Sequence, residues 1–551
     1  MSSTAPARAA GTAKVMTARA LEPSRLALYL VLLCAAALRL GIFAYTLAPQ
    51  VLEDRPELST PFSSLRALRE THYLFHHPPS PIPGTASGGI PDPYSAGTVH
   101  HSPLLLPLLH SALQRMHRSD DVLPTALIWT AADVVAGWLL FRICLTREVA
   151  LWARKTHLWS WDQSRAVKVA ALFLFNPYTL ATCLARSTVT LEVVALLATV
   201  HAAMAGSAVS LALHWAFSSL ISLYPTLLLP MLIQLARRRA GECVYEREVA
   251  RIGSANSTAK PSRQLGFLVD RVRSAKRFMV FKCVVLMPAA LAGGLWLSRA
   301  IALSPGDASI RALVGNIATV VQVPLEEGWA WTEQVYGSVL LATDLTPNLG
   351  LWWYFFMEIF DHFRDFFLLT FNVHLACYVL PFSIKYRQDP LFGITLMSGV
   401  MAVFKSYPTL GDHAVFLALL SLHSQIFEYM RYPLVSTLTY AYCTCLSPAF
   451  HHLWLTAGSA NANFFYAITL VWALGGGMLV LDAMWAWGRE RWEKERPPIR
   501  ARSKVQPKAP VRDEPLLDTD ASDGDAPAVA AIDAAERDQK ENRARRVVVQ
   551  V

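Results

Sequence analysis

Apolar runs, most of them long enough to cross a lipid bilayer as a helix, recur along the chain. The clearest cover residues 26–47, 126–145, 167–184, 191–235 (enough for two spans), 278–297, 366–382, 391–404, 415–427 and 464–487, and shorter runs cover 104–113, 313–323 and 434–446. About 20 consecutive apolar residues span the hydrocarbon core of a membrane. The pattern therefore predicts an all-α polytopic membrane protein with about twelve transmembrane helices.

Composition and charge support a membrane protein and indicate how the chain is oriented in the membrane. Only 17% of the 551 residues are charged, against about a quarter in soluble domains. Lys and Arg favour the cytosolic side of a membrane. Residues 237–277 hold eleven Lys/Arg against four Asp/Glu, whereas residues 49–102 hold three Arg against five Asp/Glu. We therefore expect a basic cytosolic loop at 237–277, a first luminal loop at 49–102, and both termini in the cytosol.

Three regions follow from the same patterns. Residues 1–24 are expected to form a cytosolic N-terminal arm and residues 25–490 a multi-span membrane domain. Residues 491–551, rich in Pro, Ala, Asp, Arg and Lys, are typical of a disordered cytosolic tail. The basic loop has few aromatic residues and no recognisable nucleic-acid-binding motif, so membrane topology explains its charge and no nucleic-acid partner is expected. The sequon at Asn256 would lie in the cytosol, out of reach of glycosylation.

One apolar run contains several charges. In FMEIFDHFRDFFLLTF (356–371), four polar residues follow a helical i, i+3, i+4, i+7 spacing, and Arg364 lies about 60° from the second of them; they are Glu358, Asp361, His362 and Asp365. A charge at the bilayer centre costs roughly 2.5–3.5 kcal/mol. Two interpretations stay open: a site for a polar ligand or partner, and an ion network that only joins helices.

Two further segments combine polar groups with helix breaks. In FKSYPTLGD (404–412), Lys405 precedes Pro408 and Gly411, and the backbone of a broken helix can serve a ligand at membrane depth. Lys405 would either meet a lipid phosphate or extend to the membrane interface. The stretch SLYPTLLLP (222–230) has a similar break without the charge.

In HHLWLTAGSANANFFYAITL (451–470), two amides stand among aromatic side chains. Asn461 and Asn463 can donate and accept hydrogen bonds, and rings such as Phe464 and Phe465 can cover the apolar faces of a sugar. The alternative is that one Asn caps the helix that follows. Both roles are compatible if each Asn takes one.

Catalytic and metal-binding patterns are sparse. The pairs Asp412-His413 and His451-His452 lack the matched spacing of a di-metal centre, so no metal or cofactor is expected. Residues 49–102 contain no Cys, and neither G-x-S-x-G nor G-x-x-x-x-G-K-[ST] occurs in the chain. That segment has carboxylates, including Asp54, but no D-x-D motif. In dolichol-phosphate-using glycosyltransferases, a carboxylate of the first luminal loop acts as general base.

Several long motifs in the same order carry a family resemblance. TPNLGLWWYFFMEIFDHFRDFF, FKSYPTLGD and HHLWLTAGSANANFFYAITL closely resemble the class U family of phosphatidylinositol-glycan biosynthesis (PIG-U), a membrane subunit of GPI transamidase. DPYSAGTVHHSPLLLPLLH, FLFNPYTLATCLARSTV and SLYPTLLLP fit it as well, so the match covers roughly residues 25–490.

The resemblance implies a function beyond what the residues themselves indicate. The family resides in the endoplasmic reticulum membrane, in a complex that attaches glycosylphosphatidylinositol (GPI) to precursor proteins. Its catalytic Cys and His belong to a separate caspase-like peptidase subunit. The class U subunit is non-catalytic, binds the GPI glycolipid, and is similar in scaffold to the polytopic dolichol-phosphate-sugar glycosyltransferases. The partners implied are the other subunits, the GPI glycolipid and membrane lipid.

Matching positions acquire expected roles from this resemblance. Asn461 and Asn463 would face the glycan or ethanolamine phosphate, and Phe464 and Phe465 would wall the site. The core that contains Asp361, His362 and Arg364 has no assigned role, and Arg364 and Lys405 are the candidates to face a phosphate. The alternative function is an active endoplasmic reticulum mannosyltransferase with Asp54 as its base. A transporter would be expected to show an inverted repeat, and none is evident.

Overall fold

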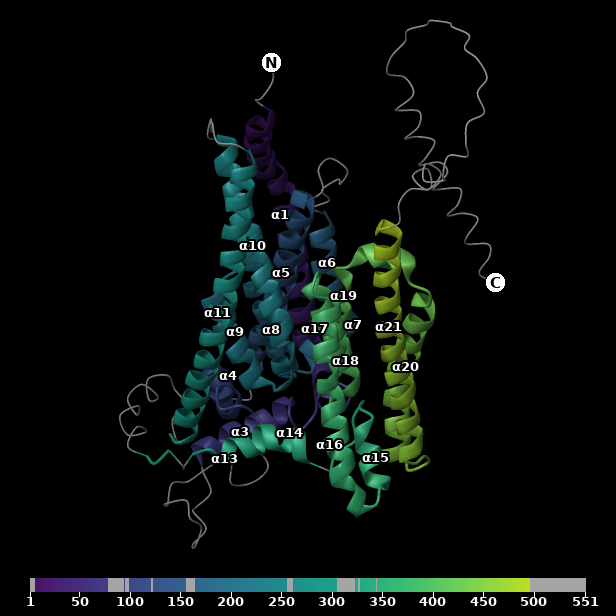
Figure 1. The fold of residues 1–551 in the computed structure, drawn as a ribbon. Coiled ribbons are helices and arrows are strands. Elements are labelled where there is room, and N and C mark those ends of the chain that lie inside the picture. The colour runs from purple at the N-terminus through teal and green to yellow at the C-terminus, as the bar shows by residue number, and fades with distance from the viewer. Residues whose placement is uncertain are drawn as a thin grey trace, which may run out of the picture. The chain divides into compact units, whose positions relative to one another are not determined.

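The computed structural model describes residues 5–77, 94, 99–119, 122–154, 164–254, 261–304, 323–325, 328–342 and 344–495. Regular structure within these residues is helical throughout (Figure 1). The chain divides into two units, residues 1–492 and residues 493–551, and the fold described below is that of the first.

The helices differ widely in length, from single turns to more than ten. In chain order they are α1 (Ala5–Tyr45), α2 (Ala48–Glu53), α3 (Leu65–His76), α4 (Leu105–Ser119), α5 (Leu123–Arg154), α6 (Ser164–Leu174), α7 (Pro177–Leu184), α8 (Val189–Ala205), α9 (Ala208–Ile221), the 3₁₀ turn η2 (Tyr224–Leu228), α10 (Leu229–Ser254), α11 (Pro261–Ala302), α13 (Ala330–Thr332), the π-helical turn η3 (Glu333–Gly337), α14 (Ser338–Leu341), α15 (Trp352–Glu358), α16 (Asp361–Cys377), α17 (Val379–Lys385), α18 (Pro390–Phe404), α19 (Leu410–Ser421), the 3₁₀ turn η4 (Ser424–Tyr429), α20 (Pro433–Leu455) and α21 (Ala462–Glu495).

The prediction of a polytopic helical membrane protein is confirmed, but not its count of spans. Among the described residues, five helical segments are long and apolar enough to cross a membrane: Arg25–Tyr45, Leu123–Arg147, Gly266–Ala302, Asp361–Lys385 and Ala462–Glu495. The bent pair α6–α7 makes a sixth if it counts as one span. Helices α8, α9, α18 and α19 are apolar but shorter. The run 191–235, expected to hold two spans, is divided among three helices, which is why fewer of its pieces reach full length.

Local chemistry explains these divisions. Between α8 and α9, Gly206 adopts a left-handed conformation with φ of 74° and ends one helix. Ser207 then caps the next, its side chain accepting from the backbone N–H of Ser210. A glycine followed by a serine is a strong stop-and-start signal for helices. The two helices therefore form a tight hairpin inside a continuous apolar run.

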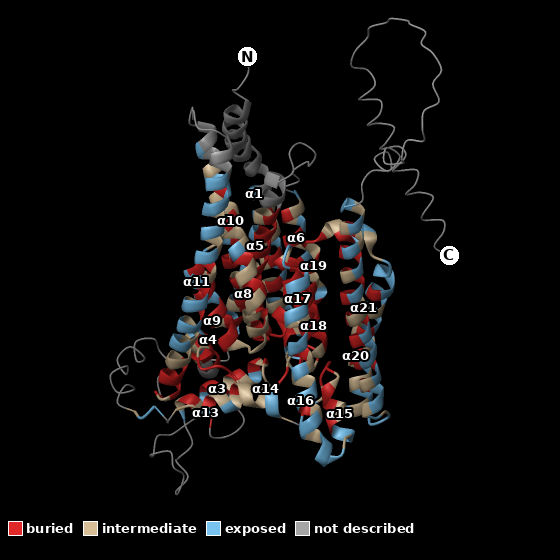
Figure 2. Ribbon diagram, in the orientation of Figure 1, coloured by how far each residue is buried: buried red, intermediate tan, exposed pale blue. Residues whose placement is uncertain are grey.

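The core of the membrane domain runs along α18. Every residue from Pro390 to Val403 is buried, and Figure 2 shows the buried positions concentrated on inner helices such as α8, α18 and α19. Long helices such as α11 keep an exposed face, which suits contact with lipid. Trp472 of α21 donates to the buried His413 of α19 over 3.0 Å, which joins the C-terminal helix to this core.

A buried ion pair closes the break between α6 and α7. Asn176 caps α7 by accepting from the N–H of Tyr178, so the carbonyl of Leu174 loses its usual helical donor. Arg39 of α1, fully buried, donates to that carbonyl over 2.8 Å and to Asp133 of α5 over 2.9 Å. The guanidinium thus satisfies a freed backbone acceptor while its own charge is neutralised.

The first predicted loop packs against several distant helices. Leu65 and Leu68 are buried on α3, and Phe62 lies just before it. The carbonyl of Ser63 accepts from the N–H of Thr188 over 2.8 Å. The carbonyl of Glu57 accepts from the N–H of Leu410 over 2.9 Å, and its carboxylate accepts from Ser447 over 2.7 Å.

The basic segment 237–277 is helical over most of its length. Helix α10 runs to Ser254 and α11 begins at Pro261, so only a short connection separates them. Ion pairs between Arg238 and Glu242 (3.2 Å) and between Arg271 and Glu248 accompany these helix extensions. The long side chains of a charged helix pair with each other at i, i+4 spacing, which favours helix over loop here.

Candidate functional site

The two Tyr-Pro-Thr breaks noted in the sequence lie side by side. The hydroxyl of Tyr224, at the start of η2, accepts from the N–H of Ser406 over 3.2 Å and lies 3.2 Å from its hydroxyl. Lys405, immediately before, places its ammonium 5.6 Å from the centre of the Tyr224 ring. Two segments almost 200 positions apart thus form one structure of interrupted helices.

Lys405 is buried and paired within the protein. Its Nζ lies 2.6 Å from Oδ1 of Asp412, while Oδ2 of Asp412 accepts from the N–H of Thr409 over 2.8 Å. This second contact belongs to a capping box that starts α19. Glu192 of α8, which is hydrogen-bonded to Ser222, adds a second negative charge near Lys405. Asp412 therefore both begins a helix and balances a buried cation.

A pocket opens beside this cluster. It holds about 540 Å³ of space, including the part open to the outside, and its lining combines the two helix breaks with the first loop and η3. Charged and aromatic side chains both contribute to its walls, among them Glu192, Lys405, Phe62, Tyr336 and Tyr407. Such a mixture of a few charges with apolar surface is typical of ligand-binding pockets.

An aromatic cluster lies next to the pocket. Trp353 of α15 packs against Trp454 of α20 and Phe465 of α21, with ring centres 6.0 and 5.8 Å apart. Phe465 is fully buried, whereas Phe464 is 51% exposed, with its ring centre 6.0 Å from that of Phe450. The two predicted wall residues therefore differ: Phe465 holds the helices together, and Phe464 presents an aromatic surface.

Asn461 and Asn463 lie at the exposed start of α21. The helix begins at Ala462, two residues before the expected Phe464, so Asn463 is in its first turn and Asn461 immediately precedes it. The side-chain oxygen of Asn463 accepts from the hydroxyl of Tyr354. Gly458, with φ of 61°, turns the chain from α20 toward these amides. Both amides are exposed beside the aromatic cluster.

The charged stretch 356–371 is two helices rather than one. Glu358 ends α15 and Asp361 begins α16, so the expected single helical face does not form. Asp361 is 88% exposed and pairs with Arg364 over 3.1 Å, and the adjacent His362 is exposed too. The carboxylate of Glu358 lies beside the hydroxyl of Tyr354 and favours its protonated form, which raises the pKa of that phenol.

Tyr354 and Tyr407 connect these parts. Tyr354 joins Glu358 to Asn463, and Tyr407 belongs to the aromatic cluster while also lining the pocket. The ring of Tyr407 lies 5.0 Å from that of Phe62 in the first loop. The three segments with the strongest family resemblance therefore meet in one region, together with the first loop.

The carboxylates of the first loop are placed differently from one another. Glu53 pairs with Arg186, whose backbone has a positive φ of 52°. Glu57 is buried and accepts from Ser447. Asp54, the candidate base, is exposed at the end of α2 and is not among the residues that line the pocket.

Sequence reasoning missed two residues of this region. Tyr354 appears in the sequence as one aromatic among many, so nothing marked it as the link between Glu358 and Asn463. Glu192 did carry a signal, because it is a lone acid within the long apolar run 191–235, and ionisable groups in such runs are costly unless they serve a purpose.

Comparison with known proteins agrees with the resemblance. A family model described as GPI transamidase subunit PIG-U matches residues 33–472. The chain is 28% identical to the human GPI-anchor transamidase component PIGU over 484 residues, 84% of this chain and 94% of the human protein. It is 29% identical over 439 residues to the GPI transamidase component GAB1 of Saccharomyces cerevisiae, covering 79% of this chain and 88% of the yeast protein. Because the family model spans most of its length, this chain belongs to the PIG-U family of GPI transamidase subunits.

Proposed function

We propose that this GPI transamidase component has no catalytic residues of its own and presents the GPI lipid for attachment to the C-terminus of precursor proteins. The observation that carries the proposal is the meeting of the amide-aromatic surface and the charged pocket at Tyr407. The peptide-cleaving chemistry would then come from a caspase-like partner subunit.

Each part of this region suits a different part of a glycolipid. The exposed amides of Asn461 and Asn463, beside Phe464, offer hydrogen bonds and a ring face to a sugar. Arg364 is the better candidate to face a phosphate, because its side chain is 34% exposed and its partner Asp361 lies at the surface. Lys405 is already paired with Asp412, so we assign it to bracing the pocket.

Replacing both amides tests the glycan role. In cells that lack the endogenous component, N461A/N463A should lower surface display of a GPI-anchored reporter about tenfold, which corresponds to about 1.4 kcal/mol of lost hydrogen bonding. The unprocessed precursor should accumulate. Q50A, which removes an exposed amide of α2, is the matched control. Normal display by N461A/N463A in a fully assembled complex would refute the glycan role.

Two variants of one ion pair test the phosphate role. R364Q should reduce anchor attachment, because it removes the cation. D361N should leave attachment normal or improve it, because it frees the same guanidinium. Equal losses in both variants would instead indicate that the pair only stabilises the start of α16. Co-purification of the caspase-like subunit with each variant keeps assembly defects separate from binding defects.

The alternative, an active mannosyltransferase, depends on Asp54. The two neighbouring carboxylates are engaged, Glu53 with Arg186 and Glu57 with Ser447, and Asp54 is exposed away from the pocket lining. We therefore favour a glycosyltransferase-like scaffold without that chemistry. Sugar transfer by the purified chain that D54N abolishes would reverse this choice.

We also propose a topology for the whole chain in the endoplasmic reticulum membrane. The long segments, the bent pair, the four shorter apolar helices, α10 and α20 together would supply the twelve expected spans. Both termini and the junction of α10 and α11 would then face the cytosol, and residues 49–102 the lumen. Protease protection of tags placed at the termini tests this, and glycan on Asn256 would contradict it.

A further inference from the structure

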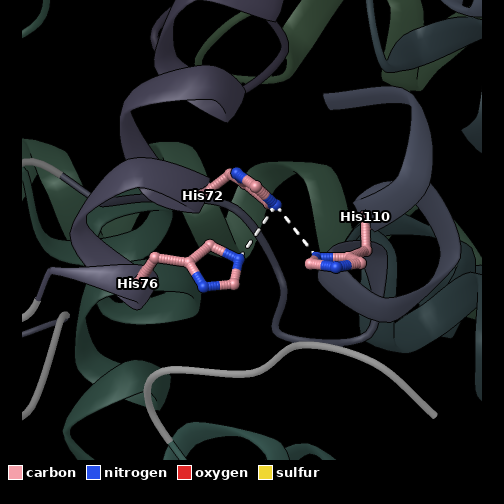
Figure 3. Close-up of side chains that lie close together, drawn as sticks. All are labelled: His72, His76 and His110. Carbon is pink, nitrogen blue, oxygen red and sulfur yellow. Dashed lines mark hydrogen bonds between the residues drawn. The ribbon is translucent and has the colours of Figure 1, made fainter. Parts of the chain in front are cut away.

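Three histidines from two helices converge, two of them within the first loop and the third on the helix that follows it. His72 and His76, one turn apart on α3, face His110 of α4 (Figure 3). Nε2 of His72 lies 3.2 Å from Nε2 of His76 and 3.2 Å from Nδ1 of His110. The three ring nitrogens all lie within 4.8 Å of one another.

Hydrogen bonding between neutral rings does not account for both short contacts. A ring nitrogen has a single in-plane site, which holds either a proton to donate or a lone pair to accept. Nε2 of His72 therefore makes one good hydrogen bond, yet two ring nitrogens lie at hydrogen-bond distance from it. A cation at the centre would instead accept one lone pair from each of the three rings.

The spacing matches a first-row divalent ion. Zinc–nitrogen bonds of about 2.0–2.1 Å in tetrahedral geometry place neighbouring ligand nitrogens roughly 3.3 Å apart. Two of the three nitrogen–nitrogen distances, at 3.2 Å, are already close to this value. A side-chain rotation of His76 or His110 would bring their nitrogens to the same distance from each other. Imidazole ligands suit zinc, and three of them leave the fourth position to water or an anion.

The surroundings hold the ligands in place. The contact between α3 and α4 is apolar up to the histidines, with Leu65 and Leu68 packed against Leu105, Leu109 and Leu113. His72 lies one turn beyond Leu68, and His110 directly follows Leu109. Three imidazoles thus extend an apolar helix contact, with His72 buried and the other two partly exposed.

We propose that His72, His76 and His110 bind a single zinc ion that fastens α3 to α4. The ion would join positions 34 residues apart and fix the helix that follows the pocket-lining segment around Phe62. The pair His72 and His76 has the i, i+4 spacing that places two ligands on one helix face, a signal visible in the sequence. His110, far along the chain, could not be assigned to the same place from sequence. This site is independent of the proposed glycolipid role.

Zinc titration of the purified full-length chain tests the proposal. The protein carries a tag without histidines, is stripped with a chelator, and is titrated with Zn²⁺ alone. Wild type should bind one zinc per chain. H76Q should bind at least about 100-fold more weakly, since loss of even an outer-shell partner costs 10–100-fold. H77Q, which removes the exposed neighbouring imidazole, is the matched control and should bind like wild type.

Two further readouts keep the result interpretable. Co²⁺ in the same site should give the intense visible absorption of a tetrahedral centre, which H76Q lacks and H77Q keeps. Metal-free wild type and H76Q should unfold at the same temperature, and if H76Q does not fold, H110Q takes its place. Less than one zinc in five chains, or equal affinities for H76Q and H77Q, would overturn the proposal.

Discussion

Two junctions between apolar helices of the membrane domain each hold a buried cation, and the chain completes the two junctions differently. Between α6 and α7, Arg39 donates to the freed carbonyl of Leu174 and pairs with Asp133, so the break is filled by protein. Between α18 and α19, Lys405 pairs with Asp412, but the break itself lines a pocket. Both charges are buried and balanced, and the lining of the pocket described above includes Lys405 but neither Arg39 nor Asp133.

The comparison shows that a buried charge is not by itself a functional site. The guanidinium of Arg39 donates to protein groups, including backbone carbonyls, and its side chain is fully buried. Around Lys405, a second acid, Glu192, and the ring of Tyr224 also line the pocket. A buried ion pair stabilises the fold at both junctions. The pocket beside Lys405 distinguishes the junction between α18 and α19.

The largest expected loss of stability comes from removing the guanidinium of Arg39, which fills the break between α6 and α7. R39L leaves Asp133 buried without its partner, which costs about 3–5 kcal/mol, and the detergent-solubilised protein should lose most of its folded population. R39L/D133L should recover much of that loss, because two apolar residues replace a desolvated pair. R142L, which removes an exposed arginine of α5, should leave the melting temperature unchanged. A stable R39L would show that the pair does not hold the break.

Removing Lys405, between α18 and α19, should reduce stability less than removing Arg39 does, but should reduce anchor attachment more. K405M is expected to lose about 2 kcal/mol, less than a fully buried pair, because the side chain of Asp412 is 20% exposed and keeps some hydration. Reporter anchoring should fall even where the protein stays folded. K385M, at an exposed end of α17, is the control. A K405M protein that unfolds like R39L but anchors normally when folded would erase the distinction between the two breaks.

A buried imidazole should give the smallest effect, and only in acid. His101, whose ring nitrogens have no partners among the described residues, is kept neutral because burial, helped by nearby His100, lowers its pKa to about 3. Its stability contribution is complete above the unfolded pKa near 6.5 and is lost as pH falls from 6.5 toward 3. Between pH 7 and pH 5 the loss should reach up to about 2 kcal/mol.

H101F separates this titration from packing. The variant keeps a buried ring but cannot take up a proton, so its melting temperature should fall less than that of wild type between pH 7 and pH 5. H77F, at an exposed position, should follow wild type. Identical acid profiles for H101F and wild type would assign the acid sensitivity to other groups.

Much of this fold was readable from the chain because burial in a membrane leaves long apolar runs. The polytopic helical class and the long apolar helices follow from such runs, whereas the number of spans does not, and the PIG-U resemblance rested on contiguous motifs. The helix break at Phe360 was missed, since nothing in FMEIFDHFRDFF marks where one helix ends. Helical periodicity assumes an unbroken helix, so Glu358 and Asp361 were placed on one face incorrectly.

The site was foreseeable in parts but not as an assembly. Lys405, Asn461 and Asn463 are candidates from the sequence because polar groups stand out in apolar surroundings. Their relation depends on Tyr407, which joins segments far apart in sequence, and no local pattern encodes such a contact. The partner of Lys405 could have been suspected, because Asp412 lies seven positions on, but its capping role required the structure.

The contact between Glu57 and Ser447 has a consequence for how the protein is made. The carboxylate in the first loop finds its hydroxyl partner 390 residues later in the chain. At translation rates of 5–20 residues per second, that partner arrives roughly 20–80 s after Glu57 leaves the ribosome. Until then, the early helices must be inserted and held with the first loop incompletely anchored. During this interval the incompletely folded nascent chain is exposed to chaperones and degradation factors of the cell's quality-control machinery.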